Sequence, residues 1–346
     1  MPHHTRCLVL TGGSAADGPY GIDKLGTLGY ELVEVKPASH RLHRKMRDVI
    51  QHRTGLPLDK TLRSVPRARN SDLVLAFLER EALTAAALAR RGVPPYANRP
   101  LAMICCWLAD ELREMPAESR RRVAARYQGV DLTIVFSENQ IDILVDAGFS
   151  EGSVEAVPFG FADETFTPQP FDSRTPSITA VGFDRGRDYA TLMEAVRGTN
   201  LRVDLYCKPQ NIAGIPLPDN VEFHGVVPFD RYRQAISSAQ IIAVPTREMA
   251  YPSGQTVALE AGATGACLVL TRTPALSEYF TDDTALLCDP GDVQYWREAL
   301  MRAAEDSELR EGLGAAAARD IRSRFTYTQM WKRIDDLFRD RSWISS

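Results

Sequence analysis

Short apolar runs alternate with longer helix-like segments along almost the whole chain, and this rhythm limits the possible folds more than any other feature. Strand-like runs such as CLVLTGG (7–13) and DLVLAFL (72–78) are followed by segments of helical character, such as EREALTAAALARRG (79–92). Strands that are separated by helical crossovers form parallel sheets with helices on both faces. The sequence therefore predicts an α/β protein built from Rossmann-like, doubly wound sheets.

The rhythm is interrupted once, at FADETFTPQPFDSRTP (161–176), which holds three prolines and shows no hydrophobic periodicity. A chain of 346 residues is long enough for two domains. We therefore expect a linker here, between Rossmann-like domains at 1–160 and 177–324, and a terminal helix at 325–346 that could pack back on the first domain. Two such domains are expected to face each other across a cleft at the carboxyl ends of their strands, where ligands of such folds bind.

Bulk composition excludes several classes of protein. Charged residues make up 25% of the chain, and a net charge of -4 with a pI of 5.9 gives no general case for nucleic-acid binding. The start MPHHTRCLVLTGG lacks a signal-peptide pattern, and no apolar run approaches the ~18 residues of a membrane span, so a cytoplasmic protein is expected. The six cysteines include no CxxC pair, which favours reduced, buried thiols.

Basic side chains are concentrated between residues 36 and 69, where ten lysines and arginines are opposed by two aspartates. The ten are Lys36, Arg41, Arg44, Lys45, Arg47, Arg53, Lys60, Arg63, Arg67 and Arg69. Such a segment could hold an acidic acceptor, could rest on anionic lipid headgroups as a peripheral membrane contact, or could be a solvated basic face. Nucleic-acid binding is disfavoured because no aromatic residue is interleaved with these charges.

Glu260 is conspicuous because SGQTVALEAGATG (253–265) is otherwise small and apolar after its polar start. A buried carboxylate is costly unless it is hydrogen-bonded. If a helix capped by Ser253 begins here, its free N–H groups could bind phosphate, and Glu260 would lie two turns further on, roughly 9–10 Å away. That distance suits the pentose hydroxyls of a nucleoside diphosphate. The alternative is a buried glutamate that is paired with protein groups.

The stretches IIAVPT (241–246) and YPSGQTVALEAGATGACLVLTRTPALSEYF (251–280) resemble the donor-binding segment of the retaining family-4 glycosyltransferases, which have the GT-B fold. Glu260 falls on the second of that family's paired glutamates, Gly265 on its glycine and Glu278 on its downstream acidic residue. Three further segments resemble the family in the same order: VPFGFADETFTP (157–168), AVGFDRGRDYATLMEA (180–195) and PDNVEFHGVVPFDRYRQAISSAQIIAVP (218–245). The resemblance covers residues 125–330 well and residues 1–125 loosely.

The chain departs from the family pattern at the first glutamate, whose place is taken by Pro252 before an SGQ turn. That glutamate contacts the donor sugar in the family, so the departure leaves the sugar open. The resemblance implies that Arg187, or Arg185, neutralises the diphosphate leaving group; the alternative is a surface network with Asp184 and Asp188. The implied donor-binding residues are Gly12, Gly13, Lys208, Gly225, Val226, Ser253, Gly254, Gln255, Thr256 and Glu260.

The acceptor site is expected in the first domain. PLAMICCWLADEL (100–112) ends a strand with Trp107 and Asp110, where many family members carry a histidine. Asp110 could accept a hydrogen bond from an acceptor hydroxyl and Trp107 could line the pocket, although a core tryptophan and a helix-capping aspartate would explain them equally well. Tyr20, Arg44 and Arg47 complete the expected acceptor-binding set.

These features predict a GT-B glycosyltransferase that moves a sugar from a nucleoside diphosphate sugar to a small-molecule, glycan or lipid-linked hydroxyl acceptor, with retention of anomeric configuration. Neither a metal nor another cofactor is expected, because no plausible DxD-type carboxylate pair occurs and cationic side chains can replace it. A nucleotide-sugar epimerase of GT-B architecture and a non-catalytic two-lobed binding protein remain the alternatives. NAD binding is disfavoured because the glycines after the first strand do not form GxGxxG.

Overall fold

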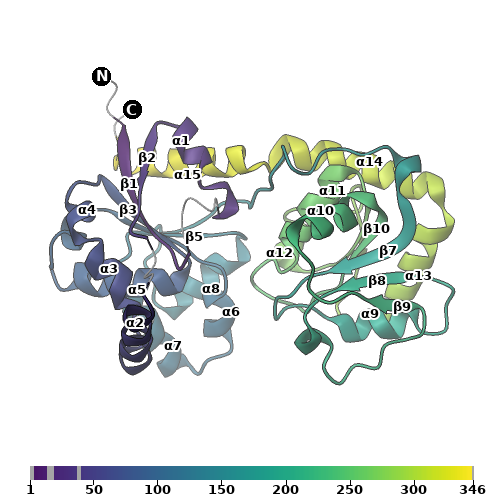
Figure 1. Cartoon of the computed structure of the whole chain (residues 1–346), viewed down its shortest axis with the longest axis horizontal. Coiled ribbons are helices and arrows are strands. Elements are labelled where there is room, and N and C mark those ends of the chain that lie inside the picture. The colour runs from purple at the N-terminus through teal and green to yellow at the C-terminus, as the bar shows by residue number, and fades with distance from the viewer. Residues whose placement is uncertain (1–3, 14–18, 37–39, 345–346) are drawn as a thin grey trace. The chain divides into compact units, whose positions relative to one another are not determined.

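The computed structural model describes residues 4–13, 19–36 and 40–344, and the chain divides into two compact units (Figure 1). Unit 1 comprises Met1–Pro158 and Thr328–Ser346, and unit 2 comprises Phe159–Tyr327. Each unit is built around one six-stranded sheet, and every pair of neighbouring strands is parallel. The predicted α/β class with two Rossmann-like sheets is confirmed.

The sheet of unit 1 has the strand order β2-β1-β3-β4-β5-β6. Its strands are β1 (Thr5–Leu10), β2 (Tyr30–Val33), β3 (Leu73–Phe77), β4 (Leu101–Ile104), β5 (Leu132–Val135) and β6 (Val154–Ala156). All five residues of β3, LVLAF, are buried. A continuous apolar strand of this kind is covered on both faces, as in a parallel sheet, which explains why the sequence shows runs here and not alternation.

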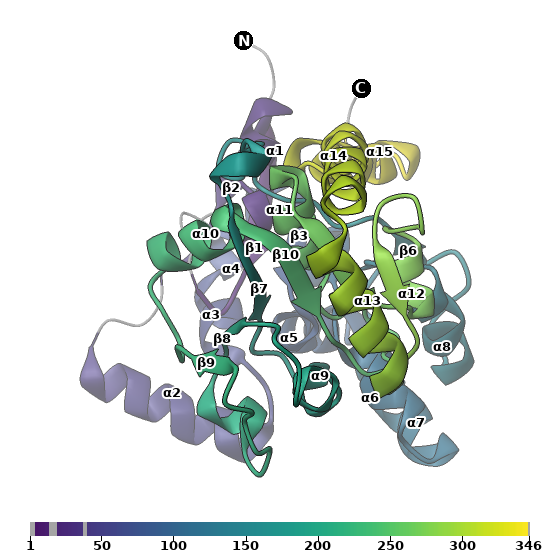
Figure 2. The same cartoon turned by 90° about the vertical axis from the view of Figure 1, so that its right-hand side faces the viewer.

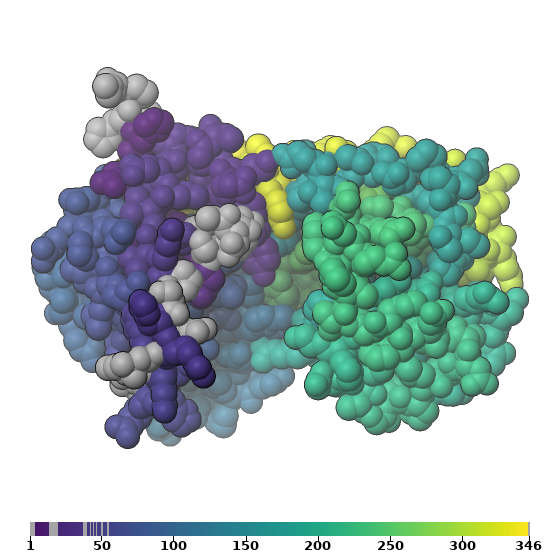
Figure 3. Space-filling view, viewed as in Figure 1, coloured from purple at the N-terminus to yellow at the C-terminus, as the bar shows by residue number. Residues whose placement is uncertain are grey.

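Nine α-helices occur in unit 1 within the described residues. They are α1 (Lys24–Thr27), α2 (Arg41–Thr54), α3 (Leu58–Arg63), α4 (Val65–Arg69), α5 (Glu79–Arg90), α6 (Leu108–Arg113), α7 (Ala117–Ala124), α8 (Asn139–Ala147) and α15 (Tyr327–Asp340), whose first residue belongs to unit 2. The basic segment identified in the sequence therefore folds into α2, α3 and α4. Figure 2 shows α2 at the periphery of unit 1, and in the space-filling view it forms a ridge on the surface (Figure 3).

The sheet of unit 2 has the order β12-β11-β10-β7-β8-β9. Its strands are β7 (Thr175–Val181), β8 (Val203–Tyr206), β9 (Val221–Phe223), β10 (Ala239–Val244), β11 (Cys267–Thr271) and β12 (Leu286–Cys288). Its helices are α9 (Tyr189–Val196), α10 (Phe229–Ser238), α11 (Gln255–Thr264), α12 (Pro274–Ser277), α13 (Val293–Glu305) and α14 (Ser307–Arg324). Aspartates begin three of them: Asp188, Asp292 and Asp306 each accept a hydrogen bond from a backbone N–H in the first turn.

The segment expected as a linker, 161–176, is instead part of unit 2. Phe161 and Phe166 are buried, and the last two residues of the segment begin β7. Phe161 also pairs with the end of unit 2, because its N–H donates to the Phe325 carbonyl (2.8 Å) and its carbonyl accepts from Tyr327 N–H (2.9 Å). The prolines interrupt periodicity, but the two aromatic side chains that precede them are buried in unit 2, and the sequence pattern did not reveal this.

The amphipathic tail forms α15, which packs within unit 1. Trp331 is fully buried, and its Nε1 donates to the carbonyl of Tyr20 (2.7 Å). Asp335 lies one turn further along and accepts from the Tyr30 hydroxyl (2.8 Å). No helix in the described residues is both long and apolar enough to cross a membrane.

Candidate functional site

Arg187 is the centre of a charged group at the carboxyl end of β7 in unit 2. Its side chain is 4% exposed, and its Nε donates to Asp184 Oδ2 over 2.8 Å. A backbone bridge between Arg187 and Thr246 fixes the loop that carries it. The Nη1 atom of the guanidinium is buried and has no hydrogen-bond partner among the described residues. Arg187 therefore holds an unused donor inside the protein.

Glycines make room for this guanidinium. A Cβ on Gly182, whose φ is +150°, would lie 2.3 Å from Arg187 Cζ. A Cβ on Gly254, whose φ is +85°, would lie 2.4 Å from Val244 Cγ1 and 3.0 Å from Arg187 Nη1. Gly254 is thus required both by its left-handed backbone and by the close approach of the arginine.

The first turn of α11 lies against Arg187. Gly254 is the N-cap residue and has no side chain with which to cap the helix. In the described chain the backbone N–H groups of Gly254, Thr256 and Val257 donate to no backbone acceptor. The expectation that Ser253 caps this helix is wrong, because its hydroxyl donates to Asp184 Oδ1 instead (2.5 Å). Gln255 is buried, and its Nε2 donates to the Tyr251 hydroxyl (3.1 Å).

Both members of the Arg187–Asp184 pair are charged. Burial raises the pKa of Asp184, but the guanidinium and hydrogen bonds from Ser253 and the Gly186 N–H outweigh burial and hold that pKa below its usual value. Burial lowers the pKa of Arg187, and the Asp184 carboxylate outweighs burial and raises it. A charged guanidinium with a free donor, beside the open N–H groups of a helix, forms an anion-binding arrangement.

Glu260 lies further along α11 and is 7% exposed. The Tyr232 hydroxyl, from α10, donates to its Oε2 atom. Burial raises the pKa of Glu260 to about 8, and the Tyr232 hydrogen bond acts in the opposite direction. The sequence left open whether Glu260 is reserved for a ligand or paired with the protein. In the structure Tyr232 occupies one carboxylate oxygen and is its hydrogen-bond partner among the described residues.

The other expected donor-binding residues of unit 2 lie near the ends of neighbouring strands. Lys208 follows β8, is exposed, and places its Nζ 5.7 Å from the centre of the Phe183 ring. Gly225 follows β9 with φ +72°, and Val226 is 58% exposed. Arg185 is exposed, in contrast to Arg187, so the two arginines that the resemblance implied for the diphosphate, with Arg187 favoured, differ clearly in burial.

Gly12 and Gly13 follow β1 in unit 1, and Gly12 lines a pocket of about 310 Å³. Lys60 lines this pocket and donates to the carbonyls of Thr11 and Gly13, which ties the loop down. Glu81, from the first turn of α5, is half-buried in the same pocket, and burial raises its pKa. Its carboxylate makes no hydrogen bond within the described chain, so it could accept one from a ligand hydroxyl.

The expected acceptor residues do not form one group. Asp110 is 2% exposed and lies 3.5 Å from Arg113 Nη2, so it offers almost no surface to an acceptor. The backbone N–H of Trp107 donates to Glu79 Oε1 (3.0 Å). The ring of Tyr20 is half-buried, and its centre lies 5.2 Å from that of the Phe77 ring. Arg47 lines the Glu81 pocket and pairs with Asp48 (2.7 Å). The side chain of Arg44 lies outside the described part of the structure.

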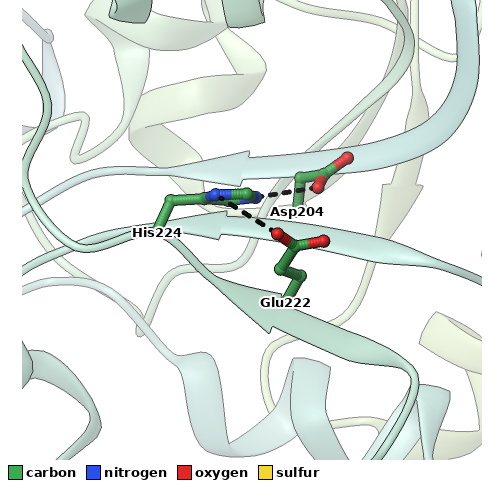
Figure 4. Close-up of side chains that lie close together, drawn as sticks. All are labelled: Asp204, Glu222 and His224. Atoms are coloured by element: carbon green, nitrogen blue, oxygen red, sulfur yellow. Dashed lines mark hydrogen bonds and ion pairs between the residues drawn. The ribbon is translucent and has the colours of Figure 1, made fainter.

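Three potential metal ligands meet near the edge of the unit 2 sheet. Asp204 on β8 and Glu222 on β9 are partners in register, and His224 follows two residues later, so their ligand atoms lie within 4.8 Å of one another (Figure 4). His224 Nε2 lies 2.9 Å from Asp204 Oδ1, whereas its Nδ1 lies 3.8 Å from Glu222 Oε1. The carboxylates therefore face opposite nitrogens of one ring. Ser177 also donates to Asp204 Oδ2 (2.7 Å), so hydrogen bonds from protein groups account for the position of Asp204.

Comparisons with known proteins agree with this architecture. Residues 187–336 match a family described as glycosyl transferase-like. The sucrose-phosphate synthase of Thermosynechococcus elongatus is similar with a TM-score of 0.75 and 17% identity, covering 99% of this chain and 100% of that one. The chain has the GT-B fold.

Two further GT-B structures are similar over their whole length. HepE of Anabaena, solved in complex with UDP and glucose, has a TM-score of 0.71 and 15% identity, covering 98% of this chain and 100% of that one. A glycosyltransferase from Rickettsia africae has a TM-score of 0.69 and 14% identity, covering 98% and 99%. No curated protein sequence matches the chain.

Sequence reasoning missed two residues of these sites, Tyr232 and Glu81. Tyr232 lies within a helix that the sequence did predict, but nothing in FDRYRQAISSA (229–239) marks its hydroxyl as the partner of Glu260, 28 residues away. Glu81 lies in the first turn of a predicted helix, where an acidic residue is ordinary. Only the folded chain shows that it faces the glycines after β1.

Proposed function

We propose that this protein transfers a sugar from a nucleoside diphosphate sugar, bound at the Arg187 and α11 group of unit 2, to a hydroxyl acceptor. The observation that carries the proposal is the buried, unpartnered Arg187 Nη1 beside the first turn of α11. An unsatisfied buried N–H costs roughly 1–3 kcal/mol. A diphosphate would satisfy this donor and the open N–H groups of Gly254, Thr256 and Val257 at once.

The same group would favour the chemical step. Cleavage of a sugar–phosphate bond builds negative charge on the departing diphosphate, and fixed donors that already point at that position stabilise it without reorganisation. Asp184 keeps the guanidinium oriented through Nε while Nη1 stays available. In this proposal Arg187 and the N–H groups of α11 take the role that a divalent cation could otherwise take. Arg185 and Lys208, both exposed, could add charge around the diphosphate.

Glu260 is proposed to accept from the hydroxyls of the nucleotide's pentose. It lies on α11, the helix whose first turn would hold the diphosphate, and hydrogen bonds from pentose hydroxyls would add to that of Tyr232 in offsetting the cost of burying its charge. The structure of HepE of Anabaena in complex with UDP-glucose is similar to this chain with a TM-score of 0.73. A UDP-sugar is therefore the first donor to test. Gly225 and Val226 are proposed to lie beside the base.

The acceptor is proposed to bind in unit 1, where the pocket with Gly12, Lys60 and Glu81 offers a carboxylate for a hydroxyl and cations for an acidic group. Retention of configuration and a place among the family-4 enzymes, with SGQ as a variant donor motif, rest on the resemblance of residues 125–330. The exposed basic side chains of α2, among them Arg41, Lys45 and Arg53, are proposed to meet an acidic acceptor or anionic headgroups.

A donor screen tests this function. Purified protein is heated with UDP, GDP, ADP and TDP sugars, and we expect one nucleotide to raise the unfolding temperature. That donor is then incubated with and without candidate acceptors, and the products are resolved by mass spectrometry and NMR. Transfer with an α-linked product from an α-linked donor supports a retaining transferase. Interconversion of the sugar without acceptor would instead identify an epimerase, and binding without turnover of any acceptor a binding protein.

A further inference from the structure

Glu260 is held by the protein on one side only. Tyr232 reaches it from α10 and donates its hydroxyl to Oε2. In the part of the chain that the structure describes, no second donor reaches the carboxylate. An ionised carboxylate can accept about four hydrogen bonds. The other oxygen, Oε1, therefore keeps its capacity to accept.

Tyr232 is itself firmly placed. Its ring meets that of Phe166 edge to face, with centroids 6.4 Å apart at 86°, and lies nearly parallel to that of Phe229 at 6.1 Å and 29°. Its backbone N–H donates to the carbonyl of Pro228 (3.0 Å) in the first turn of α10. Aromatic packing on two sides restricts the ring, so the hydroxyl is presented in a fixed direction.

We propose that Tyr232 is a positioning residue for nucleotide binding: its hydroxyl fixes Glu260 through Oε2 so that Oε1 is oriented to accept the pentose hydroxyls. This inference rests on the proposed function, because it requires a nucleotide beside Glu260. Tyr232 then acts through Glu260 and need not touch the ligand. A preorganised acceptor costs less ordering on binding than one that must be recruited from several rotamers.

Charge supports the geometry. Burial raises the pKa of Glu260 to about 8, and the Tyr232 hydrogen bond lowers it, so removal of the hydroxyl moves ionisation to higher pH. Tyr232 is the titratable group that acts on Glu260, while Arg187 and Tyr327 act on Tyr232. A carboxylate accepts more strongly when ionised. Affinity for a ligand with pentose hydroxyls should therefore increase as the pH rises toward about 8 and level off above it. In a variant without the Tyr232 hydroxyl the levelling-off should come at a higher pH.

The first experiment measures binding of UDP and of 2′,3′-dideoxy-UDP to the full chain by calorimetry at pH 8.5, above the pKa of about 8 of Glu260. Tyr232→Phe keeps the ring and removes the hydroxyl. We expect it to weaken UDP binding roughly tenfold and to leave dideoxy-UDP binding unchanged, because that ligand has no pentose hydroxyl for Glu260 to accept. Tyr295→Phe, which removes the hydroxyl of an exposed tyrosine on α13, is the matched control and should change neither.

The second experiment follows UDP-glucose affinity from pH 6 to 8.5, a range in which its diphosphate does not titrate. Tyr232→Phe should displace the rise in affinity to higher pH, whereas lost packing alone would weaken binding equally at every pH. Glu260→Gln provides a second route should Tyr232→Phe not fold: it should abolish the discrimination between UDP and dideoxy-UDP. In the Glu260→Gln background, Tyr232→Phe should add nothing.

The outcomes separate this inference from the function on which it rests. Wild-type protein that fails to bind UDP, or that binds both ligands equally, contradicts the proposed donor site and this inference with it. Wild-type protein that discriminates while Tyr232→Phe discriminates to the same extent, with an unchanged pH profile, overturns the role of Tyr232 alone.

Discussion

At the scale of single residues, Arg187 combines burial, charge and an unused donor. A purely structural ion pair has no need of the third property. Asp184 neutralises the guanidinium through Nε, and Ser253 and the Gly186 N–H complete the hydrogen bonds of that carboxylate. The remaining Nη1 atom lies where a side chain on Gly254 would otherwise be. The glycine therefore gives room to a charged donor that has no hydrogen-bond partner among the described residues.

Arg187→Lys tests this interpretation. The lysine keeps the charge beside Asp184 but replaces the planar fork by one ammonium, which cannot reach Asp184 and a diphosphate in the same geometry. We expect turnover to fall by roughly 10²-fold while the protein stays folded, measured by steady-state kinetics with the preferred donor. Arg202→Lys, at an exposed arginine of the same unit, is the control and should retain turnover. Equal turnover in both variants would contradict the assignment of Arg187 to the diphosphate.

Glu260 makes a prediction about stability. Its pKa is raised from 4.5 to about 8 in the folded chain. Between these two values the unfolded chain releases the proton while the folded chain retains it, so stability of the ligand-free protein declines as pH rises from 4.5 to 8. Glu260→Gln does not titrate. The difference between its unfolding free energy and that of the wild type, measured by urea denaturation, should therefore change in favour of the variant as the pH rises over this interval. The change should be on the order of a few kcal/mol, and the difference should be constant above it.

Glu298→Gln is the matched control for that measurement, because Glu298 is an exposed carboxylate on α13. It should show no pH-dependent difference from the wild type. A difference between Glu260→Gln and the wild type that stays constant from pH 5 to 8.5 would show that the carboxylate is not held protonated by its surroundings.

At the scale of elements, α11 joins the two halves of the proposed donor site. Its first turn supplies N–H groups, and its second carries Glu260. The helix can approach β10 and Arg187 this closely because its N-cap is a glycine with a left-handed backbone. The far end is closed by Gly265, which is also left-handed at φ +95°. Burial of nearly every residue between these two glycines holds the helix rigidly in place.

Gly254→Ala should damage this element. The φ of +85° is strained for alanine, and the added Cβ would meet Val244 at 2.4 Å and Arg187 Nη1 at 3.0 Å. We expect a loss of stability of roughly 1–3 kcal/mol and a larger, separate loss of nucleotide affinity. Gly312→Ala in α14 is the matched control: nothing lies within 4 Å of its Cβ position, so it should stabilise the protein by roughly 0.5–1 kcal/mol. Chemical denaturation and calorimetry report the two effects, and nucleotide affinity that survives Gly254→Ala would exclude α11 from the site.

The elements also show how far a sequence can be interpreted. Runs of buried residues such as LVLAF (73–77) predicted the strands, and the isolated carboxylate of Glu260 marked its helix. Ser253 was assigned to the wrong partner because Asp184, 69 residues away, competes for its hydroxyl more effectively than the helix does. The Ala-rich helix α14 escaped notice, since its apolar face is built from small residues that give little periodicity. A pairing between residues far apart in the sequence, such as that of Ser253 with Asp184, leaves no trace in the local sequence pattern.

At the scale of the whole molecule, the chain passes from unit 1 to unit 2 after Pro158 and returns after Tyr327. Two consecutive helices, α14 and α15, therefore belong to different units (Figure 1). Helix α15 therefore supplies apolar side chains from the end of the sequence to the core of unit 1: Trp331, Ile334 and Phe338 are all fully buried. Stability of unit 1 should consequently depend on α15, whereas nucleotide binding through Arg187, Glu260 and Tyr232, which lie in unit 2, should not.

Trp331→Ala separates these two properties. The substitution removes the indole from a site that is fully buried and deletes the hydrogen bond from Nε1 to the Tyr20 carbonyl. Loss of a buried tryptophan costs roughly 3–5 kcal/mol. Thermal unfolding should therefore show an early transition, which limited proteolysis would assign to peptides of unit 1. Trp331→Phe, which retains most of the apolar contact, should shift that transition less. Below the early transition, calorimetry should find UDP affinity unchanged in both variants, because Arg187, Glu260 and Tyr232 lie in unit 2; a parallel loss of UDP affinity would mean that the nucleotide site depends on unit 1.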